Sequence, residues 1–237
     1  EIPKITPGES QPDSERVSSF VYPGGILAVH AKGRGKDEIW AALKNKNVYG
    51  TSGPRILLWF DLINSPEGRT PMGSEITMSQ NPRFIVRAAG SFKQKPGCSN
   101  ESIDSLSAKR LDYLCAGECY NPSNQREVIE KIEVIKITPQ VYAGEAVSPL
   151  IQDPWKSIPC QGKGECIVEF EDQDFSRDSV YYVRAIQSPT PAINGSPLSQ
   201  RDNFELCKGS FRTDLKDDCL SMTNERAWSS PIYIDKP

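Results

Sequence analysis

The chain has 237 residues, of which 25% are charged and 37% hydrophobic, and 28 lysines and arginines against 31 acidic residues give a net charge of −3. This balance, together with the lack of a long basic block, argues against nucleic acid as a partner. The 17 glycines and 19 prolines argue against a helical bundle. No apolar run approaches the ~18 residues that span a bilayer, so we expect no membrane span.

The N-terminal quarter of the chain predicts a strand, a helix and a second strand. Residues 1–17, rich in proline, serine and charge, predict a linker or surface loop. Residues 25–31 predict a buried strand with apolar residues on both faces, as in parallel sheets. A helix is expected over 36–47, with acidic residues in its first turn and lysines near its end. After a turn, residues 55–63 predict another strand, and this order is typical of α/β architecture.

From about residue 70 the sequence predicts half-buried strands that alternate apolar and polar residues. Residues 129–137 change parity between Val134 and Ile135, which indicates a bulge, with a helix as the alternative. Pro231 removes a ladder donor from the last strand and favours an edge position. The main strand candidates are 83–89, 129–137, 166–172, 179–187 and 227–234. We therefore expect an antiparallel β-sandwich with two long, ordered loops, at 91–127 and 188–225.

All seven cysteines follow residue 97, and none stands in a C-x-x-C pair. They indicate disulfides formed in an oxidising compartment, periplasmic or extracellular, with buried free thiols as the alternative. Proximity in the sequence suggests the pairs Cys115–Cys119, Cys160–Cys166 and Cys207–Cys219. Cys98 is an alternative to either member of the first pair, and one thiol is left over.

The only histidine, His30, ends the first predicted strand. In α/β sheets this end of a strand faces the ligand crevice, so His30 is a candidate catalytic residue. Arg55 is a second catalytic candidate, and Lys32 and Arg34 are candidates for binding a phosphate, sulfate or carboxylate. The alternatives are that His30 closes an ordinary strand, that Lys32 and Arg34 are solvated, and that Arg55 pairs with an acid such as Asp61.

Other chemistry is poorly supported by the sequence. The sequence has no G-x-S-x-G motif, so it does not indicate a serine hydrolase. One histidine is too few for a multinuclear metal centre, so we predict no metal site in these residues. Calcium binding by Asp172, Asp174 and Asp178 is a weak alternative, because the stretch lacks the pattern of an EF-hand loop. Four aromatic residues suggest either a sugar-binding platform or ordinary core packing. These are Trp155, Tyr181, Tyr182 and Trp228.

A series of sequence blocks follows in order along the chain, among them "YPGGILAVHAKGRGKDEIWAALKNKNVYGTSGPRILLWFDL", "RFIVRAAGSFKQKPGC", "YYVRAIQSPTPAING" and "ERAWSSPIYID". This series resembles the C-terminal part of DUF3604, a bacterial family of unknown function. The resemblance spans residues 18–235. It implies kinship with the PHP (polymerase and histidinol phosphatase) metallohydrolases, whose barrel binds a divalent metal such as zinc, manganese or iron through histidine and aspartate. Those ligands, including an Asp-x-His, would lie upstream of Glu1.

By this resemblance, residues 18–63 are the last strand and helix of a PHP-like α/β barrel, and 64–237 form the appended β-sandwich. The fold class expected is α+β and mostly β. The family often has tryptophan at the position of His30, which weakens a catalytic role for this residue.

The expected function is that of a C-terminal fragment of a metal-dependent phosphoester hydrolase. The fragment alone is expected to be inactive and to hold no cofactor. Its expected partners are the N-terminal barrel portion of the same protein and a phosphorylated small molecule. The alternative is a secreted β-sandwich module that binds a glycan or a protein, and a sandwich that only caps the barrel is compatible with the first hypothesis.

Overall fold

The computed structural model describes residues 24–115, 119–193 and 220–237. These residues belong to two compact units. The larger unit holds residues 25–93, 122–189 and 224–237, and the smaller one includes the described residues 94–115 and 119–121. The predicted linker at 1–17 lies outside the described residues, as do Cys207 and Cys219.

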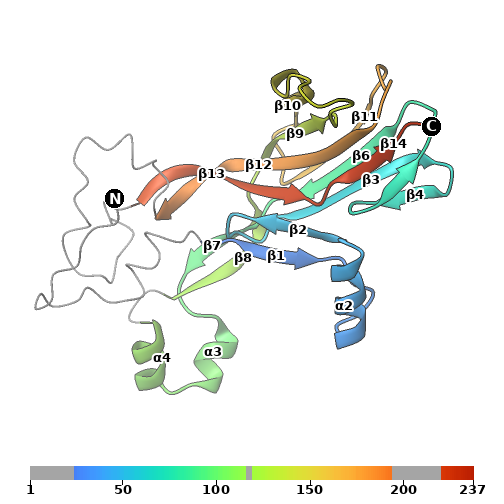
Figure 1. The fold of residues 1–237 in the computed structure, drawn as a ribbon. Coiled ribbons are helices and arrows are strands. Elements are labelled where there is room, and N and C mark those ends of the chain that lie inside the picture. The colour runs from blue at the N-terminus through green and yellow to red at the C-terminus, as the bar shows by residue number, and fades with distance from the viewer. Residues whose placement is uncertain (1–23, 116–118, 194–219) are drawn as a thin grey trace, which may run out of the picture. The chain divides into compact units, whose positions relative to one another are not determined.

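Eight of the described strands form the larger of two sheets in the larger unit. Their order is β1, β2, β13, β12, β14, β5, and β12 also pairs with β9, which pairs with β10 (Figure 1). The strands are β1 (Ile26–Val29), β2 (Val48–Thr51), β5 (Glu75–Thr77), β9 (Ile129–Ile137), β10 (Ile151–Pro159), β12 (Ser179–Ile193), β13 (Leu220–Ser229) and β14 (Ile232–Asp235). β14 and β5 run parallel, whereas β9 is antiparallel to both β10 and β12.

The second sheet of the larger unit has four antiparallel strands in the order β11, β6, β3, β4. They are β3 (Leu57–Ser65), β4 (Gly68–Pro71), β6 (Arg83–Ala89) and β11 (Glu165–Glu171). The expected domain boundary between residues 63 and 64 falls inside β3. A short 3₁₀ helix, η1 (Ser148–Leu150), precedes β10.

The two sheets share one hydrophobic core. Alternate residues of β3, such as Leu58 and Phe60, point into it, as do Phe84 of β6 and Tyr181 of β12. The rings of Phe84 and Tyr181 meet across the sheets with centroids 4.8 Å apart. Burying a side chain of this size stabilises the fold by roughly 1.5–3 kcal/mol, so the alternating pattern selects this arrangement. The predicted mostly-β architecture with antiparallel strands is confirmed.

The predicted strand–helix unit forms, but its surroundings differ from the prediction. β1 is followed by α2 (Lys36–Lys44), which has Asp37 and Glu38 in its first turn and Lys44 in its last. β1 pairs antiparallel with β2, and its residues Ile26 and Leu27 are exposed. The prediction of a strand buried on both faces in a parallel sheet is therefore wrong for this structure. The apolar residues of this strand predicted that it is buried, but the described residues leave Ile26 and Leu27 uncovered.

Two further details of the sheet correct the sequence analysis. Residues 129–137 form a strand rather than a helix. The register between β9 and β10 shifts between Gln152 and Lys156 of β10. The extra residues there belong to β10, opposite the bulge that was predicted in β9. Pro231 lies between β13 and β14, and β14 is flanked by β12 and β5. The prediction of an edge strand there is wrong.

Much of the segment 91–127, which was predicted as a loop, forms helices and strands. β7 (Phe92–Pro96) pairs with β8 (Tyr120–Arg126), and both strands begin or end in the larger unit. Between them lie α3 (Asn100–Ser105) and α4 (Ala108–Cys115). The side chain of Ser99 caps α3 by accepting a hydrogen bond from the backbone N–H of Ser102, 3.2 Å away. None of the described helices is long and apolar enough to cross a membrane.

Candidate functional site

His30 lies directly after β1, and its side chain is hydrogen-bonded to the backbone of β3. Its Nε2 is 2.8 Å from the carbonyl oxygen of Leu58, which can only accept, so Nε2 carries the hydrogen. The imidazole packs beside the rings of Tyr49 and Trp59, with centroids 5.3 and 5.7 Å away. The Tyr49 phenol interacts with the backbone of Leu58, and burial raises the pKa of Tyr49. His30 and Tyr49 thus satisfy polar groups of a strand edge.

The three cationic candidates have different surroundings from His30. Lys32 and Arg34 are exposed in the loop between β1 and α2, and Arg55 is exposed before β3. Arg55 does not pair with Asp61 as the alternative proposed, because Asp61 accepts bonds of 2.8 and 2.5 Å from Arg69. No interaction joins the three cations to His30 in the described residues, so their common anion site stays a prediction.

Five large apolar side chains of β1 and α2 are exposed, the two of β1 on opposite faces of the strand and the three of α2 on one side of the helix. Leu27 is 60% exposed and Trp40 62% exposed, and Ala42 is the single buried residue of α2. Ile26, Ile39 and Leu43 add to the same exposed set. Clusters of exposed apolar residues of this kind mark interaction surfaces in soluble proteins. We call the set Ile26, Leu27, Ile39, Trp40 and Leu43 the β1–α2 face.

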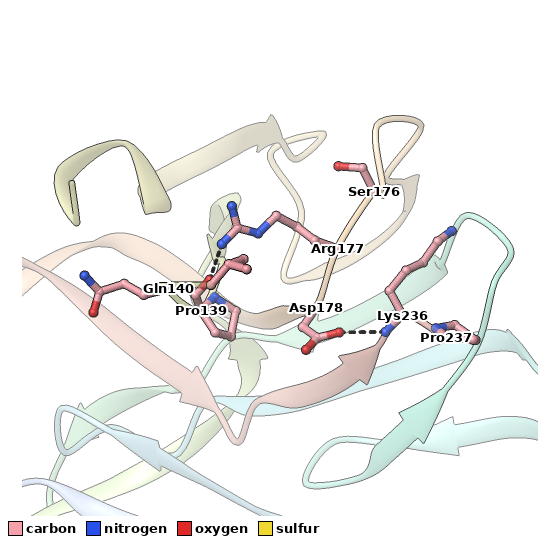
Figure 2. A pocket seen from close by; sticks show the side chains of 8 residues that line it. Pro139, Gln140, Ser176, Arg177, Asp178, Lys236 and Pro237 are labelled. Atoms are coloured by element: carbon pink, nitrogen blue, oxygen red, sulfur yellow. Dashed lines mark hydrogen bonds between the residues drawn. The ribbon is translucent and has the colours of Figure 1, made fainter. Parts of the chain in front are cut away.

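A cavity of about 330 Å³ lies at one end of the sandwich (Figure 2). Its arginine, Arg177, donates bonds of 2.8 and 3.0 Å to the carboxylate of Glu145 and a further bond to the Pro139 carbonyl. Asp178 accepts a 2.8 Å bond from the backbone N–H of Lys236, whose ammonium donates to the Ser79 carbonyl, 2.6 Å away. These charged groups already have partners within the chain, so we assign no ligand to the cavity.

Two of the three proposed calcium ligands are engaged in the structure, whereas Asp174 is exposed. Asp172 is 1% exposed and accepts hydrogen bonds from the ammonium of Lys136 and the hydroxyl of Tyr181. Asp178 is bonded to Lys236 as described above. Because Asp172 already neutralises a buried lysine, it is not available to a cation in this arrangement. The calcium alternative is therefore not supported.

The four aromatic candidates do not form an exposed platform. Tyr181 is fully buried, and Trp155, Tyr182 and Trp228 are half-buried. The Trp155 ring lies 6.0 Å from that of Tyr181 and 6.2 Å from that of Phe170, centroid to centroid. Core packing accounts for Trp155 and Tyr181 better than a sugar site does.

The described cysteines form two disulfides. Cys160–Cys166 confirms one predicted pair. The predicted pair Cys115–Cys119 is wrong, because Cys119 is bonded to Cys98, the alternative that the sequence left open. Cys115 is the free thiol among the described cysteines. The pair Cys207–Cys219 lies outside the described residues.

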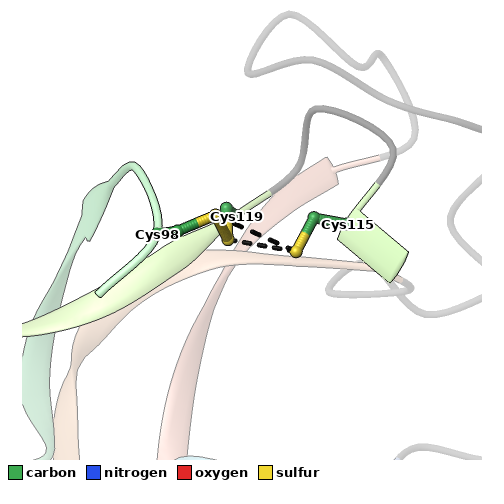
Figure 3. Close-up of side chains that lie close together, drawn as sticks. All are labelled: Cys98, Cys115 and Cys119. Carbon is green, nitrogen blue, oxygen red and sulfur yellow. Dashed lines mark hydrogen bonds between the residues drawn. A yellow bond between two sulfur atoms is a disulfide. The ribbon is translucent and has the colours of Figure 1, made fainter. Parts of the chain in front are cut away.

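The three sulfur atoms of Cys98, Cys115 and Cys119 gather in the smaller unit (Figure 3). Sγ of Cys115 lies 3.1 Å from Sγ of Cys119 and 3.9 Å from Sγ of Cys98. Within the described residues this trio is the one group of three or more cysteine, histidine or carboxylate ligands close enough to share an ion. It differs from the histidine and aspartate set expected for a PHP-like metal centre, and two of its sulfurs are joined in a disulfide.

The two sheets with their shared core, together with the two disulfides, make the protein a disulfide-containing β-sandwich. The model of a family described as "Protein of unknown function (DUF3604)" matches residues 4–96 and 156–236, more than half of the chain, and the chain therefore belongs to this family. No curated protein and no solved structure gives a significant match.

The cysteines are evident in the sequence, but their grouping is not. The spacing of Cys115 and Cys119 suggested a bond between them, whereas the pairing of β7 with β8 brings Cys98 to Cys119 from 21 residues away. The buried Lys136–Asp172 pair was not predicted either. The two residues are 36 positions apart, and the approach of Asp172 to Lys136 is seen only in the fold.

Proposed function

We propose that the chain is the C-terminal portion of a PHP-like, metal-dependent phosphoester hydrolase. The β-sandwich supports the catalytic part of the same protein, and β1 with α2 is the last strand–helix unit of its barrel. The β1–α2 face is the observation that carries this proposal, since five large apolar side chains remain exposed beside a well-packed sandwich. The family is one of unknown function, so the expected chemistry comes from the resemblance of the sequence to the PHP metallohydrolases.

The metal centre in this proposal belongs to residues preceding Glu1. The described residues bring no cluster of histidine and carboxylate ligands together, so we assign no metal ligand and no catalytic step to them. A divalent metal in such hydrolases supplies an activated water and stabilises charge on the phosphate oxygens. The proposed contribution of this chain is to bind the barrel and, through the exposed Lys32, Arg34 and Arg55, to attract the substrate anion.

The proposed location is periplasmic or extracellular. Two disulfides join described cysteines, Cys98 to Cys119 and Cys160 to Cys166. Disulfides of this kind persist in oxidising compartments and are rare in the cytosol.

Substitutions on the β1–α2 face test the proposal. Trp40→Glu places a charge in the proposed contact, so we expect it to lower the melting temperature and the phosphoesterase activity of the whole protein encoded by the gene. In the isolated 237-residue chain the same change should stay within about 0.5 kcal/mol of the parent in urea unfolding, because Trp40 is exposed there.

Ile167→Glu is the matched control, since Ile167 of β11 is 61% exposed and lies outside the β1–α2 face. It should leave the whole protein unchanged. Equal effects of Trp40→Glu and Ile167→Glu would contradict the proposed contact. The alternative, a secreted binding module, predicts no turnover in any of these proteins.

A further inference from the structure

We propose that Cys98, Cys115 and Cys119 form a thiol–disulfide exchange site, in which Cys119 alternates between Cys98 and Cys115 as its partner. The inference is independent of the hydrolase proposal. It assigns to the smaller unit a reactive site that exchanges disulfides within the chain.

The positions of the three sulfurs carry the proposal. Cys98 follows β7, Cys115 ends α4, and Cys119 precedes β8, so three separate elements deliver one sulfur each (Figure 3). The free Sγ of Cys115 is 3.1 Å from Cys119 and 3.9 Å from Cys98. Cys119 is therefore the nearer target for attack, and rotation of the Cys115 side chain into line with the Cys119–Cys98 bond makes Cys98 the leaving group.

The exchange step balances within the trio. The Cys115 thiol loses its proton, and the thiolate attacks Sγ of Cys119. A Cys115–Cys119 bond forms while the Cys98–Cys119 bond breaks, and the electron pair leaves on Cys98, which takes up a proton. One thiol and one disulfide are present before and after the step. No external oxidant or reductant is required.

The fold permits the exchange without opening the β7–β8 pair. The backbone N–H of Gly97 donates to the Cys119 carbonyl over 2.8 Å, and the side-chain amide of Asn121 donates to the Gly97 carbonyl over 2.7 Å. These bonds hold the residue before Cys98 beside Cys119 when the disulfide moves. Cys98 thus stays close enough for the reverse step.

The trio is also accessible from outside. All three cysteines are half-buried rather than enclosed, and they line a cavity of about 300 Å³ together with Leu111 and Tyr120. Thiols and alkylating reagents of small size can therefore reach the sulfurs, a condition for reactive cysteines. The structural disulfide Cys160–Cys166 differs in this respect, because Cys166 is buried in the core of the larger unit.

Mapping the free thiols of the 237-residue chain tests the proposal. The protein is incubated at about pH 8.5, where thiolates form, quenched with acid at several times, alkylated under denaturing conditions and digested for mass spectrometry. We expect the label on Cys98 to rise with time as the label on Cys115 falls, and no label on Cys160 or Cys166. A label that stays on Cys115 alone at every time overturns the proposal.

Two serine variants provide a second, independent readout. Cys98→Ser should contain a Cys115–Cys119 disulfide, and Cys115→Ser should contain Cys98–Cys119 with no time-dependent change in labelling. Both variants keep Cys207 and Cys219, whose state is mapped in the same digest. The proposal is equally overturned if Cys98→Ser leaves Cys115 and Cys119 both as free thiols while Cys160–Cys166 is intact.

Discussion

At the scale of single residues, His30 has a structural role, although histidine is a frequent catalytic residue. β4 pairs with β3 only from Asp61 onward, so none of the described strands pairs with Leu58 on that side. The ring N–H of His30 satisfies the Leu58 carbonyl, and the ring fills the space between Tyr49 and Trp59. The sequence placed His30 correctly at a strand end, but the vacant strand edge was visible only in the fold.

Replacing His30 tests this role. We expect His30→Ala to destabilise the isolated chain by about 1 to 2 kcal/mol, because the Leu58 carbonyl loses its donor and ring packing is lost. His30→Trp keeps a ring N–H and should recover part of the loss. Urea unfolding at neutral pH measures both. Lys32→Ala is the control, because its exposed side chain should contribute less than about 0.5 kcal/mol.

Glu145 contributes an acid-sensitive contact beside the cavity at the end of the sandwich. Hydrogen bonds from Arg177, and then from the backbone N–H of Val141, lower the pKa of Glu145 from 4.5 to about 2. Because the folded state lowers this pKa, the stabilisation is fully present above pH 4.5 and is lost as the pH falls through about 2.

The Glu145→Gln variant isolates this contribution. Melting temperatures measured between pH 5 and 2 should fall less steeply for Glu145→Gln than for the parent, since the variant has no proton to bind at this site. Glu67→Gln, at an exposed position in the turn between β3 and β4, should keep the parental slope. Parallel curves for the parent and Glu145→Gln would show that the contact with Arg177 is absent in solution.

At the scale of elements, alternation predicted the strands that have one face in the core. Residues 83–89 and 166–171 fold as β6 and β11 with the expected faces inward. Patterns failed where burial depends on distant partners. Ile26 and Leu27 of β1 are exposed because little of the described chain covers them. The loop 91–127 contains two helices and a strand pair that the Cys98–Cys119 disulfide joins.

The buried Lys136–Asp172 pair links β9 to the residue after β11 and to Tyr181 of β12. Lys136 is 8% exposed, and Asp172 accepts bonds from it, from Tyr181 and, over 3.1 Å, from the backbone N–H of Asp174. Burial, and then the bond to Asp172, raise the pKa of the Tyr181 phenol, so it remains a donor. Each partner therefore depends on the others for its hydrogen bonds.

Breaking this pair should be costly. We expect Asp172→Ala to destabilise the chain by about 3 to 5 kcal/mol, because Lys136 is left buried without a counter-charge. The double variant Lys136→Met with Asp172→Ala removes both charges and should recover a large part of that loss. Urea unfolding of the two single variants and the double variant gives the coupling energy. Additive losses would contradict a direct charge interaction.

At the scale of the whole molecule, the sequence predicted the mostly-β architecture and the family, and the structure supplied the sheet order and the cysteine grouping. The disulfide partner of Cys119 was not predictable from spacing, because strand pairing rather than chain proximity sets it. The exposed β1–α2 face is the surface that we propose to contact the catalytic part of the protein.

The most direct test of the proposed function compares metal content and phosphate release in the whole protein encoded by the gene with those of the isolated 237-residue chain. Elemental analysis and a panel of phosphate esters provide the two readouts. Our account predicts a stoichiometric divalent metal and turnover in the whole protein, and neither in the isolated chain. A whole protein that lacks both, or an isolated chain that binds the metal tightly and cleaves the esters, would contradict it.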